Sequence, residues 1–554
     1  MYRNDEFAFT RTVLSVAVAI VAGLASAPLL AQNTTAALGG TVTGADGKPI
    51  AGAAVSILHL ESGSVNNTIT DAAGRYAARG LRTGGPYTIS VSKAGVTDKR
   101  DDVYLQLAET LNVDATLPGV RASNTVVVTG QGGGASDKFN NTTIGSGTSL
   151  GSKDLAAFAS IQRNLQDYAR LDPRLSQTDK ERGEISVAGQ NSRYNSITID
   201  GVTTNDTFGL EGNNLPTLKQ PISIDAIQSV QINVSNYDVT QKGYTGANIN
   251  AVTKSGTNDW KGSLYYVYRD DALAGDRYNR GTDSYFAPPA FKESTKGFTI
   301  GGPIVKDKLF LFGSYEEFRS TRTAPSFGPV GDSATNVAIT PAAIASAQAI
   351  AKSAYGIDIG NFDRSGGEAL VKDKLLKIDW NINDNHRANL RYAKTEEGNP
   401  IFQNFTSSQL ALSSNTWTQV KSIETTVAQW FADWTPEFST ELKVSRRDYE
   451  SKPNNNSVLP QVSLQFINAL PPGLDPATPT SRQLFFGTER SRQFNLLATA
   501  TDDAYLAGNL LIGGHEIKGG IDYSGNKISN AFLQDTYGNY LFRCVNSRDR
   551  KSVV

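Results

Sequence analysis

The sequence contains few of the residues from which most catalytic and metal sites are built. It has one cysteine, Cys544, and three histidines among 554 residues. A single cysteine excludes an internal disulfide and any thiolate metal cluster. Three dispersed histidines leave a zinc site or a catalytic triad nearly without ligands or a base. No apolar run reaches the roughly 20 residues of a spanning helix, which excludes a polytopic helical membrane protein. We therefore predict a protein that is not an enzyme, with no catalytic residue, metal or cofactor.

Charge and hydropathy exclude little else. The chain carries 53 basic and 54 acidic residues, a net charge of −1, so no bulk electrostatic attraction to nucleic acid is expected. The mean hydropathy of −0.31 is that of a soluble protein. A membrane β-barrel has a similar average, because its strands are apolar on one face only. The 51 glycines and 21 prolines fit a turn-rich β protein.

The N-terminus predicts export from the cytoplasm. A weakly basic start precedes an apolar stretch of about a dozen residues, Val13–Leu24, which is too short to span a membrane. Cleavage after Ala27 would leave Pro28 at an unfavourable position, so we favour cleavage between Ala31 and Gln32. Residues 1–31 are therefore predicted to be a signal peptide rather than an amphipathic anchor.

Residues 36–120 contain about seven short alternating strands separated by Asp/Gly turns, a pattern typical of a small β-sandwich. The spacing resembles the carboxypeptidase regulatory-like domain, a transthyretin-like sandwich. His59 and Glu61 lack the His-x-x-Glu spacing of a metallocarboxypeptidase, so we expect no catalysis here and place His59 at a sheet edge. Similar sandwiches bind starch, which leaves a sugar-binding role open.

Residues 121–141 form a predicted linker with one β-prone strip. The strip consists of Thr125, Val126, Val127, Val128 and Thr129, and a glycine run follows it. It is either an incidental strand or a docking strand that adds an edge to a partner's sheet.

Residues 142–257 predict a mixed α/β domain. Apolar residues at helical spacing indicate a helix over 155–171, and Asp200-Gly201 is a signal for a type I′ turn in a hairpin. Asp225 and Glu211 could also be drawn as catalytic carboxylates, but no substrate-facing pair can be inferred from the sequence.

The order of these segments resembles the TonB-dependent outer-membrane receptors, and the mixed domain resembles their plug. Residues 195–202 match N-x-x-x-x-D-G-V. Residues 243–258 resemble G-x-x-x-G-G-x-I-N-x-x-T-K-x-G-T-N, with two residues instead of three between Gly243 and Gly246 and with Ala247 at the second glycine of the pair. With the sandwich in front, the chain is most similar to Oar-like receptors. The resemblance implies a TonB box at Thr125–Thr129. The plug-motif residues it implies are Asn195, Asp200, Gly201, Val202, Gly243, Gly246, Asn250, Thr253, Lys254 and Gly256.

Residues 258–548 predict part of an outer-membrane β-barrel. In the clearest hairpin, Leu376 and Trp380 alternate with Lys377 and Asp379, as expected for a lipid face and a wet lumen. Short turns alternate with long polar stretches at about 320–370, 394–424 and 447–490. Trp380, Trp430 and Trp434 suit interfacial girdles. We count about nine or ten strands where the resemblance implies about 22, so we expect a truncated barrel, and we interpret residues 549–554 as an assembly artefact.

The predicted fold class is mainly β: a small β-sandwich, an α/β plug and the N-terminal part of a transmembrane antiparallel barrel. The predicted function is TonB-dependent uptake of an unidentified extracellular ligand across the outer membrane of a Gram-negative bacterium, with the sandwich in the periplasm. The expected partners are TonB, outer-membrane lipid and that ligand, but no nucleic acid. The alternative is an outer-membrane adhesion or surface-assembly protein, with carbohydrate bound through the sandwich.

Overall fold

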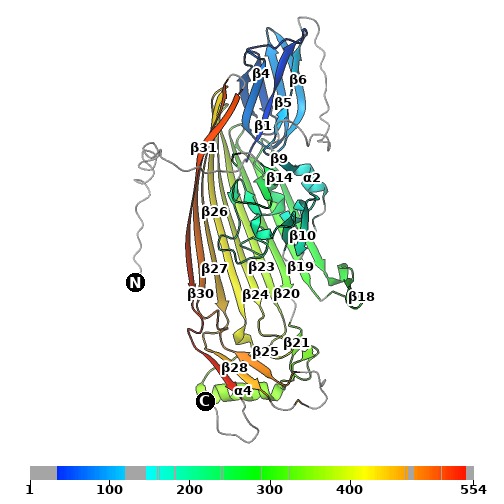
Figure 1. Ribbon diagram of the computed structural model, residues 1–554, viewed down its shortest axis with the longest axis vertical. Helices are drawn as coiled ribbons and strands as arrows, with labels where there is room; N and C mark the ends of the chain where they lie inside the picture. Colours follow the sequence, from blue (N-terminus) through cyan, green and yellow to red (C-terminus); the bar gives the residue numbers. More distant parts are fainter. Residues whose placement is uncertain are drawn as a thin grey trace, which may run out of the picture.

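The computed structural model forms three bodies: a long sheet, a small body at one end of that sheet and another body beside it (Figure 1). The described residues are 34–118, 145–158, 160, 163–179, 183–236, 239–240, 242–288, 290–322, 325–467, 470–471, 479–512 and 515–543. The predicted signal peptide with its Ala31–Gln32 cleavage site, the strip at Thr125–Thr129 and residues 549–554 lie outside them.

The first body is a β-sandwich of two facing sheets. Their strand orders are β3-β2-β5-β6 and β4-β1-β7, with β8 also paired to β1. The strands are β1 (Ala36–Gly44), β2 (Ala54–His59), β3 (Ser64–Ile69), β4 (Arg75–Leu81), β5 (Gly84–Lys93), β6 (Val96–Leu105), β7 (Thr110–Asn112) and β8 (Ala115–Leu117). Alternate residues such as Leu38, Ile57 and Ile89 fill the core between the sheets.

His59 does not lie at a sheet edge, as the sequence had suggested. It ends β2, which is flanked on both sides by β3 and β5, and it is only 5% exposed. Its ring lies 4.7 Å from the ring of Tyr87, and its Nδ1 lies 2.8 Å from the Ser62 hydroxyl. The alternation of β2 directs this side chain inward with Val55 and Ile57.

The second body is a mixed α/β unit, which we call the plug. Its main sheet has the order β13-β12-β15-β14-β9, and β10 pairs with β11 beside it. The elements are β9 (Gly145–Leu150), α2 (Ser152–Ala157), α3 (Leu165–Ala169), β10 (Leu175–Asp179), β11 (Glu184–Val187), β12 (Ser196–Ile199), β13 (Val202–Thr203), η3 (Ile224–Ala226), β14 (Ile227–Asn236) and β15 (Asn248–Thr253).

The single helix expected over 155–171 is wrong. Phe158 is extended and ends α2, and α3 starts afresh at Leu165. The Asn164 side chain accepts a hydrogen bond from the backbone N–H of Asp167 at 2.8 Å and so caps a new helix. A local capping interaction here outweighs the apolar periodicity.

The third body is a nine-stranded antiparallel sheet in the order β16-β19-β20-β23-β24-β26-β27-β30-β31. The strands are β16 (Lys261–Asp270), β19 (Lys292–Val305), β20 (Leu309–Arg322), β23 (Gly367–Asn383), β24 (His386–Ile401), β26 (Trp417–Thr435), β27 (Phe438–Asn455), β30 (Asn495–Ile512) and β31 (His515–Phe532). Among the described residues β16 and β31 pair on one side only, so the barrel is not closed.

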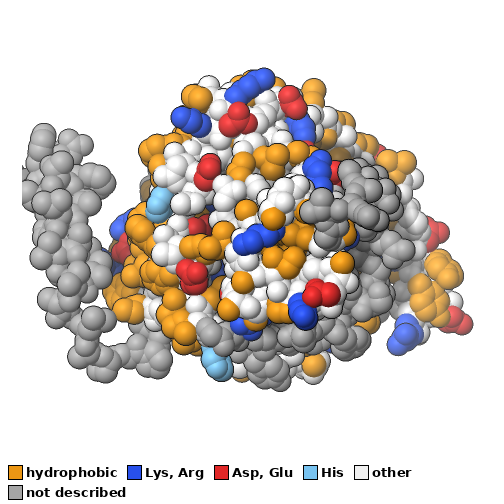
Figure 2. Space-filling view, turned by 90° about the horizontal axis from the view of Figure 1, so that it is seen from above, with side chains coloured by type: hydrophobic (Ala, Val, Ile, Leu, Met, Phe, Trp, Pro, Cys, Tyr) orange, Lys and Arg blue, Asp and Glu red, His pale blue; other side chains and the backbone are white. Residues whose placement is uncertain are grey.

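The two faces of this sheet differ as predicted. Leu376 and Trp380 are 47% and 49% exposed, whereas Lys377 and Asp379 between them are each 6% exposed. The plug lies against the charged face (Figure 1) and fills what the sequence predicted to be a wet lumen. Viewed from the sandwich end, apolar side chains gather on the side where the sheet lies (Figure 2).

The outer face of the sheet carries an apolar band, which is bounded by tryptophans at one end and by exposed ion pairs at the other. Trp380 and Trp434 are exposed beside the turns at the sandwich end. About six to eight residues farther along the strands, or about 20–26 Å at 3.3 Å per residue, exposed ion pairs begin, such as Lys374–Glu396 at 3.2 Å and Arg446–Asp502 at 3.2 Å. An apolar band between aromatic and charged residues is typical of the lipid-facing belt of an outer-membrane barrel.

The connections at the far end of the barrel fold into a cap. A sheet of order β25-β29-β28-β32 packs with a helix around its own apolar core. Its elements are α4 (Pro341–Tyr355), β25 (Gln409–Ala411), β28 (Gln461–Phe466), β29 (Arg482–Phe486) and β32 (Asn539–Arg543). The long polar stretch expected over 394–424 is therefore mostly strand, with a connection of 402–416 between β24 and β26. No helix among the described residues is long and apolar enough to cross a membrane.

Candidate functional site

The hairpin of the first plug motif is built as its sequence predicts. Asp200 and Gly201 join β12 to β13 with φ of +50° and +69°, the backbone of a type I′ turn. Val202 is buried, at 2% exposure. The Asp200 carboxylate accepts hydrogen bonds from the backbone N–H of Thr253 at 2.8 Å and from its hydroxyl at 2.9 Å. The turn is thereby tied to the end of β15.

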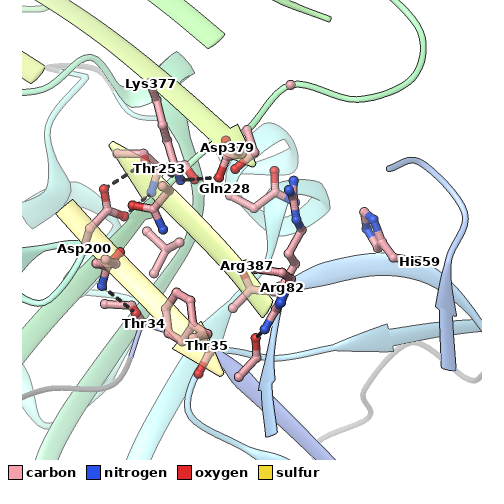
Figure 3. Close-up of a pocket in the computed structure, with 18 of the residues that line it drawn as sticks. Thr34, Thr35, His59, Arg82, Asp200, Gln228, Thr253, Lys377, Asp379 and Arg387 are labelled. Carbon is pink, nitrogen blue, oxygen red and sulfur yellow. Dashed lines mark hydrogen bonds and ion pairs between the residues drawn. The ribbon is translucent and has the colours of Figure 1, made fainter. Parts of the chain in front are cut away.

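Two cations of the barrel wall complete this contact. Nε of Arg391 on β24 lies 3.2 Å from the Asp200 carboxylate. Nζ of Lys377 on β23 donates to the Thr253 hydroxyl at 3.1 Å, and Figure 3 shows Lys377 beside Thr253. Burial alone would raise the pKa of Asp200, but Arg391, Lys377 and the hydrogen bonds from Thr253 outweigh it and hold the pKa below its usual value. We call Asp200, Thr253, Lys377 and Arg391 the plug anchor.

The second motif is fixed by close approaches to the first. The Asn195 side chain accepts from the backbone N–H of Ala247 at 2.9 Å, and a Cβ at Gly246 would lie 2.2 Å from that same side-chain oxygen. Ala247 has no positive φ and is buried, so alanine is accommodated at the position where the resemblance implies glycine. Asn250 accepts from the Thr198 hydroxyl at 2.9 Å.

Of the remaining motif residues, Gly256 lies against the barrel, whereas Lys254 and Gly243 do not. The Lys254 backbone N–H donates to the Ala226 carbonyl at 2.8 Å, and Gly243 adopts a φ of +75° in open space. Gly256 lies directly against the barrel backbone: a Cβ there would lie 2.5 Å from the Leu311 carbonyl oxygen and 2.8 Å from that of Gly302.

We expect Gly256→Ala to weaken the packing of the plug on the barrel by about 1–3 kcal/mol, because the backbone on the other side has no room to yield. The measurement is the urea midpoint of the full chain in detergent. Gly275→Ala is the matched control, since a Cβ there meets nothing within 4 Å. Equal midpoints for the two variants would contradict the prediction.

A second contact between the plug and the barrel involves no residue of the two plug motifs. Arg163 pairs with Asp225 inside the plug and lies 3.3 Å from the Glu316 carboxylate on β20. Glu316 also accepts hydrogen bonds from the Ser223 hydroxyl at 2.9 Å and the Tyr265 hydroxyl at 2.8 Å. Burial opposes the charge of Arg163, but Glu316 and Asp225 raise its pKa. Asp225, considered above as a catalytic carboxylate, is therefore a structural ion-pair partner.

The sandwich covers the turn end of the barrel next to the plug anchor (Figure 1). Lys261 pairs with Glu61 at 2.5 Å, the Asn66 amide donates to the Asp433 carboxylate at 2.7 Å, and Arg387 donates to a sandwich carbonyl at Gly80. A polar cavity of about 90 Å³ remains where sandwich, plug and barrel meet (Figure 3). Within the described ranges, no group of three or more His, Cys, Asp or Glu side chains is arranged to hold a metal ion.

Comparison with known proteins agrees with this arrangement. A profile of the outer membrane beta barrel domain matches residues 252–330, and a profile of the carboxypeptidase regulatory-like domain matches residues 37–118. In sequence, 328 residues are 27% identical to the TonB-dependent transporter Oar of Myxococcus xanthus. The chain is a homologue of Oar. The predicted Oar-like resemblance and the predicted fold class are thus confirmed.

The Oar match covers 56% of this chain and 30% of Oar. Among solved structures, the outer membrane transporter YddB from Escherichia coli has the same fold, with a TM-score of 0.50 at 11% identity. That match covers 72% of this chain and 50% of YddB. The match therefore spans less than a third of Oar and half of YddB, and the similarity to YddB is one of fold.

Proposed function

We propose that this Oar homologue acts as a TonB-dependent receptor of the outer membrane, which takes up an extracellular ligand with energy supplied from the inner membrane. The observation that carries the proposal is the plug anchor: a folded plug is held by buried polar contacts against the charged inner face of a barrel sheet. A fixed plug blocks the barrel until the plug itself is remodelled. A transporter of this design therefore needs an external source of energy to move its plug.

The position of the strip Thr125–Thr129 supports the same proposal. It lies between the end of the sandwich and the start of β9. In the described part of the plug sheet, β9 is an edge strand that pairs only with β14. A strip that joins TonB by strand addition would transmit a pull first to that edge strand. On this proposal the sandwich and the strip lie in the periplasm, the apolar band lies in the outer membrane and the cap lies outside the cell.

We expect Val127→Pro to abolish binding of the periplasmic domain of TonB, because proline removes a backbone N–H that strand addition requires. The measurement is site-directed disulfide capture in cells, with a cysteine at Val126, a cysteine scan of TonB and Cys544→Ser in the background. Val127→Thr is the matched control, since threonine retains the N–H and the β-branched shape. Capture that survives in Val127→Pro would refute the TonB-box assignment.

A further inference from the structure

The cavity at the junction of sandwich, plug and barrel is lined by two arginines that lack an acidic partner. Arg82 comes from the sandwich and Arg387 from β24, and both face the cavity (Figure 3). Neither guanidinium lies within 4.0 Å of a carboxylate oxygen of any described residue. Their contacts are neutral: Arg82 reaches the Asn381 amide oxygen at 3.5 Å, and Arg387 donates to the Gly80 carbonyl.

Each acid that lines the cavity is already engaged with another cation. Asp200 pairs with Arg391 at 3.2 Å, Glu61 with Lys261 at 2.5 Å, and Asp379 lies 3.9 Å from Lys377. The two arginines therefore have no carboxylate in direct contact at this partly buried place, and the acids that attract Arg387 from a greater distance are Asp433 and Asp379. Keeping like charges together away from water is costly unless a counterion joins them.

The positive charges around the cavity also act on His59. It also lines the cavity, and burial together with the charges of Arg82, Arg387 and Lys261 lowers its pKa to about 3. The lining also includes neutral polar side chains, namely Thr34, Thr83, Asn389, Gln429 and Thr257. Gln429 donates to the Thr34 hydroxyl, and the Thr257 hydroxyl donates to the Asp259 carbonyl. The cavity, with a volume of about 90 Å³, has room for a single tetrahedral oxyanion.

We propose that this cavity binds a free inorganic oxyanion of the size of phosphate or sulfate between Arg82 and Arg387, and that the bound anion fastens the sandwich to the barrel mouth. The planar guanidinium fork suits bidentate contact with such an anion. Because one arginine belongs to the sandwich and the other to the barrel, binding requires the docked arrangement and in turn stabilises it. The proposal concerns the docked state and does not depend on TonB.

The test uses the full chain in detergent, with inorganic phosphate as the probe and chloride at equal ionic strength as the reference. Calorimetric titration should show phosphate binding that Arg82→Gln and Arg387→Gln each weaken by about 10- to 100-fold, since each removes a charge-assisted contact. Arg75→Gln and Arg446→Gln are matched controls, because these exposed arginines have carboxylate partners, Asp71 and Asp448. The controls should bind phosphate as the parent does.

A second measurement follows docking directly. A cysteine at Gln228, which lines the cavity from the plug, is labelled with a maleimide in a Cys544→Ser background. Phosphate should slow this labelling several-fold in the parent and in the two controls but not in the Arg82 and Arg387 variants.

If the glutamine variants misfold, Arg82→Lys and Arg387→Lys serve instead. They keep the positive charge but lose the guanidinium fork, and they should bind phosphate more weakly than the parent. Phosphate binding that is absent in the parent, or unchanged in all four cavity variants, overturns the proposal. So does equal competition by a short-chain phosphatidic acid, because the proposed ligand is a free inorganic anion.

Discussion

Asp200→Asn should release the plug hairpin, with amide hydrogen exchange over residues 196–203 faster by roughly 10²- to 10³-fold. Asparagine tolerates the positive φ of the turn and can still accept from Thr253. What the variant removes is the negative charge, which leaves Arg391 buried at 2% exposure without its counterion. Removing one member of a buried ion pair costs about 3–5 kcal/mol, and local opening reports that loss directly.

Asp448→Asn is the control for this variant. Asp448 also pairs with an arginine, Arg446 at 2.9 Å, but both side chains are about half exposed on the outer face of the barrel. An exposed pair contributes at most about 1 kcal/mol, so exchange in the plug should be unchanged. The double variant Asp200→Asn/Arg391→Met should recover most of the loss, because an apolar side chain needs no counterion. If Asp200→Asn alone leaves exchange at the parent rate, the plug anchor does not hold the hairpin.

The regular parts of this fold could be predicted from the sequence because they depend on local periodicity. The alternation around Leu376 and Lys377 fixes which face of the sheet is buried, since side chains of a strand point to opposite faces in turn. The turn at Asp200-Gly201 follows from the freedom of these two residues at positive φ. Both features are decided within a few residues of chain.

The contacts that hold the bodies together could not be predicted in the same way. Arg391 lies 191 positions from Asp200 in the chain, and Arg387 lies 305 positions from Arg82. The sequence showed Asp200 as a turn residue and Arg391 as a lumen residue, but nothing local indicates that they meet. The cap was missed for the same reason: its strands are short, and β25 and β32 pair only with β29 and β28, which come from a different connection. His59 was misplaced because its burial depends on the order of strands in the sheet.

Acidification should loosen the sandwich, and His59 should account for most of the effect. An unfolded histidine takes up a proton near pH 6.5, whereas folded His59 resists protonation down to a pKa of about 3. The unfolded state therefore binds more protons between these values, so stability is complete above about pH 6.5 and falls as the pH decreases toward 3. At pH 4.5 the loss of stability amounts to about 3 kcal/mol.

Hydrogen exchange of β2 and β5, measured from pH 7 to 4.5 and corrected for intrinsic rates, should show this dependence of stability on pH. His59→Phe keeps an aromatic ring against Tyr87 but cannot be protonated, so its slope should be nearly flat. A parent slope that persists in His59→Phe would assign the acid sensitivity to other groups.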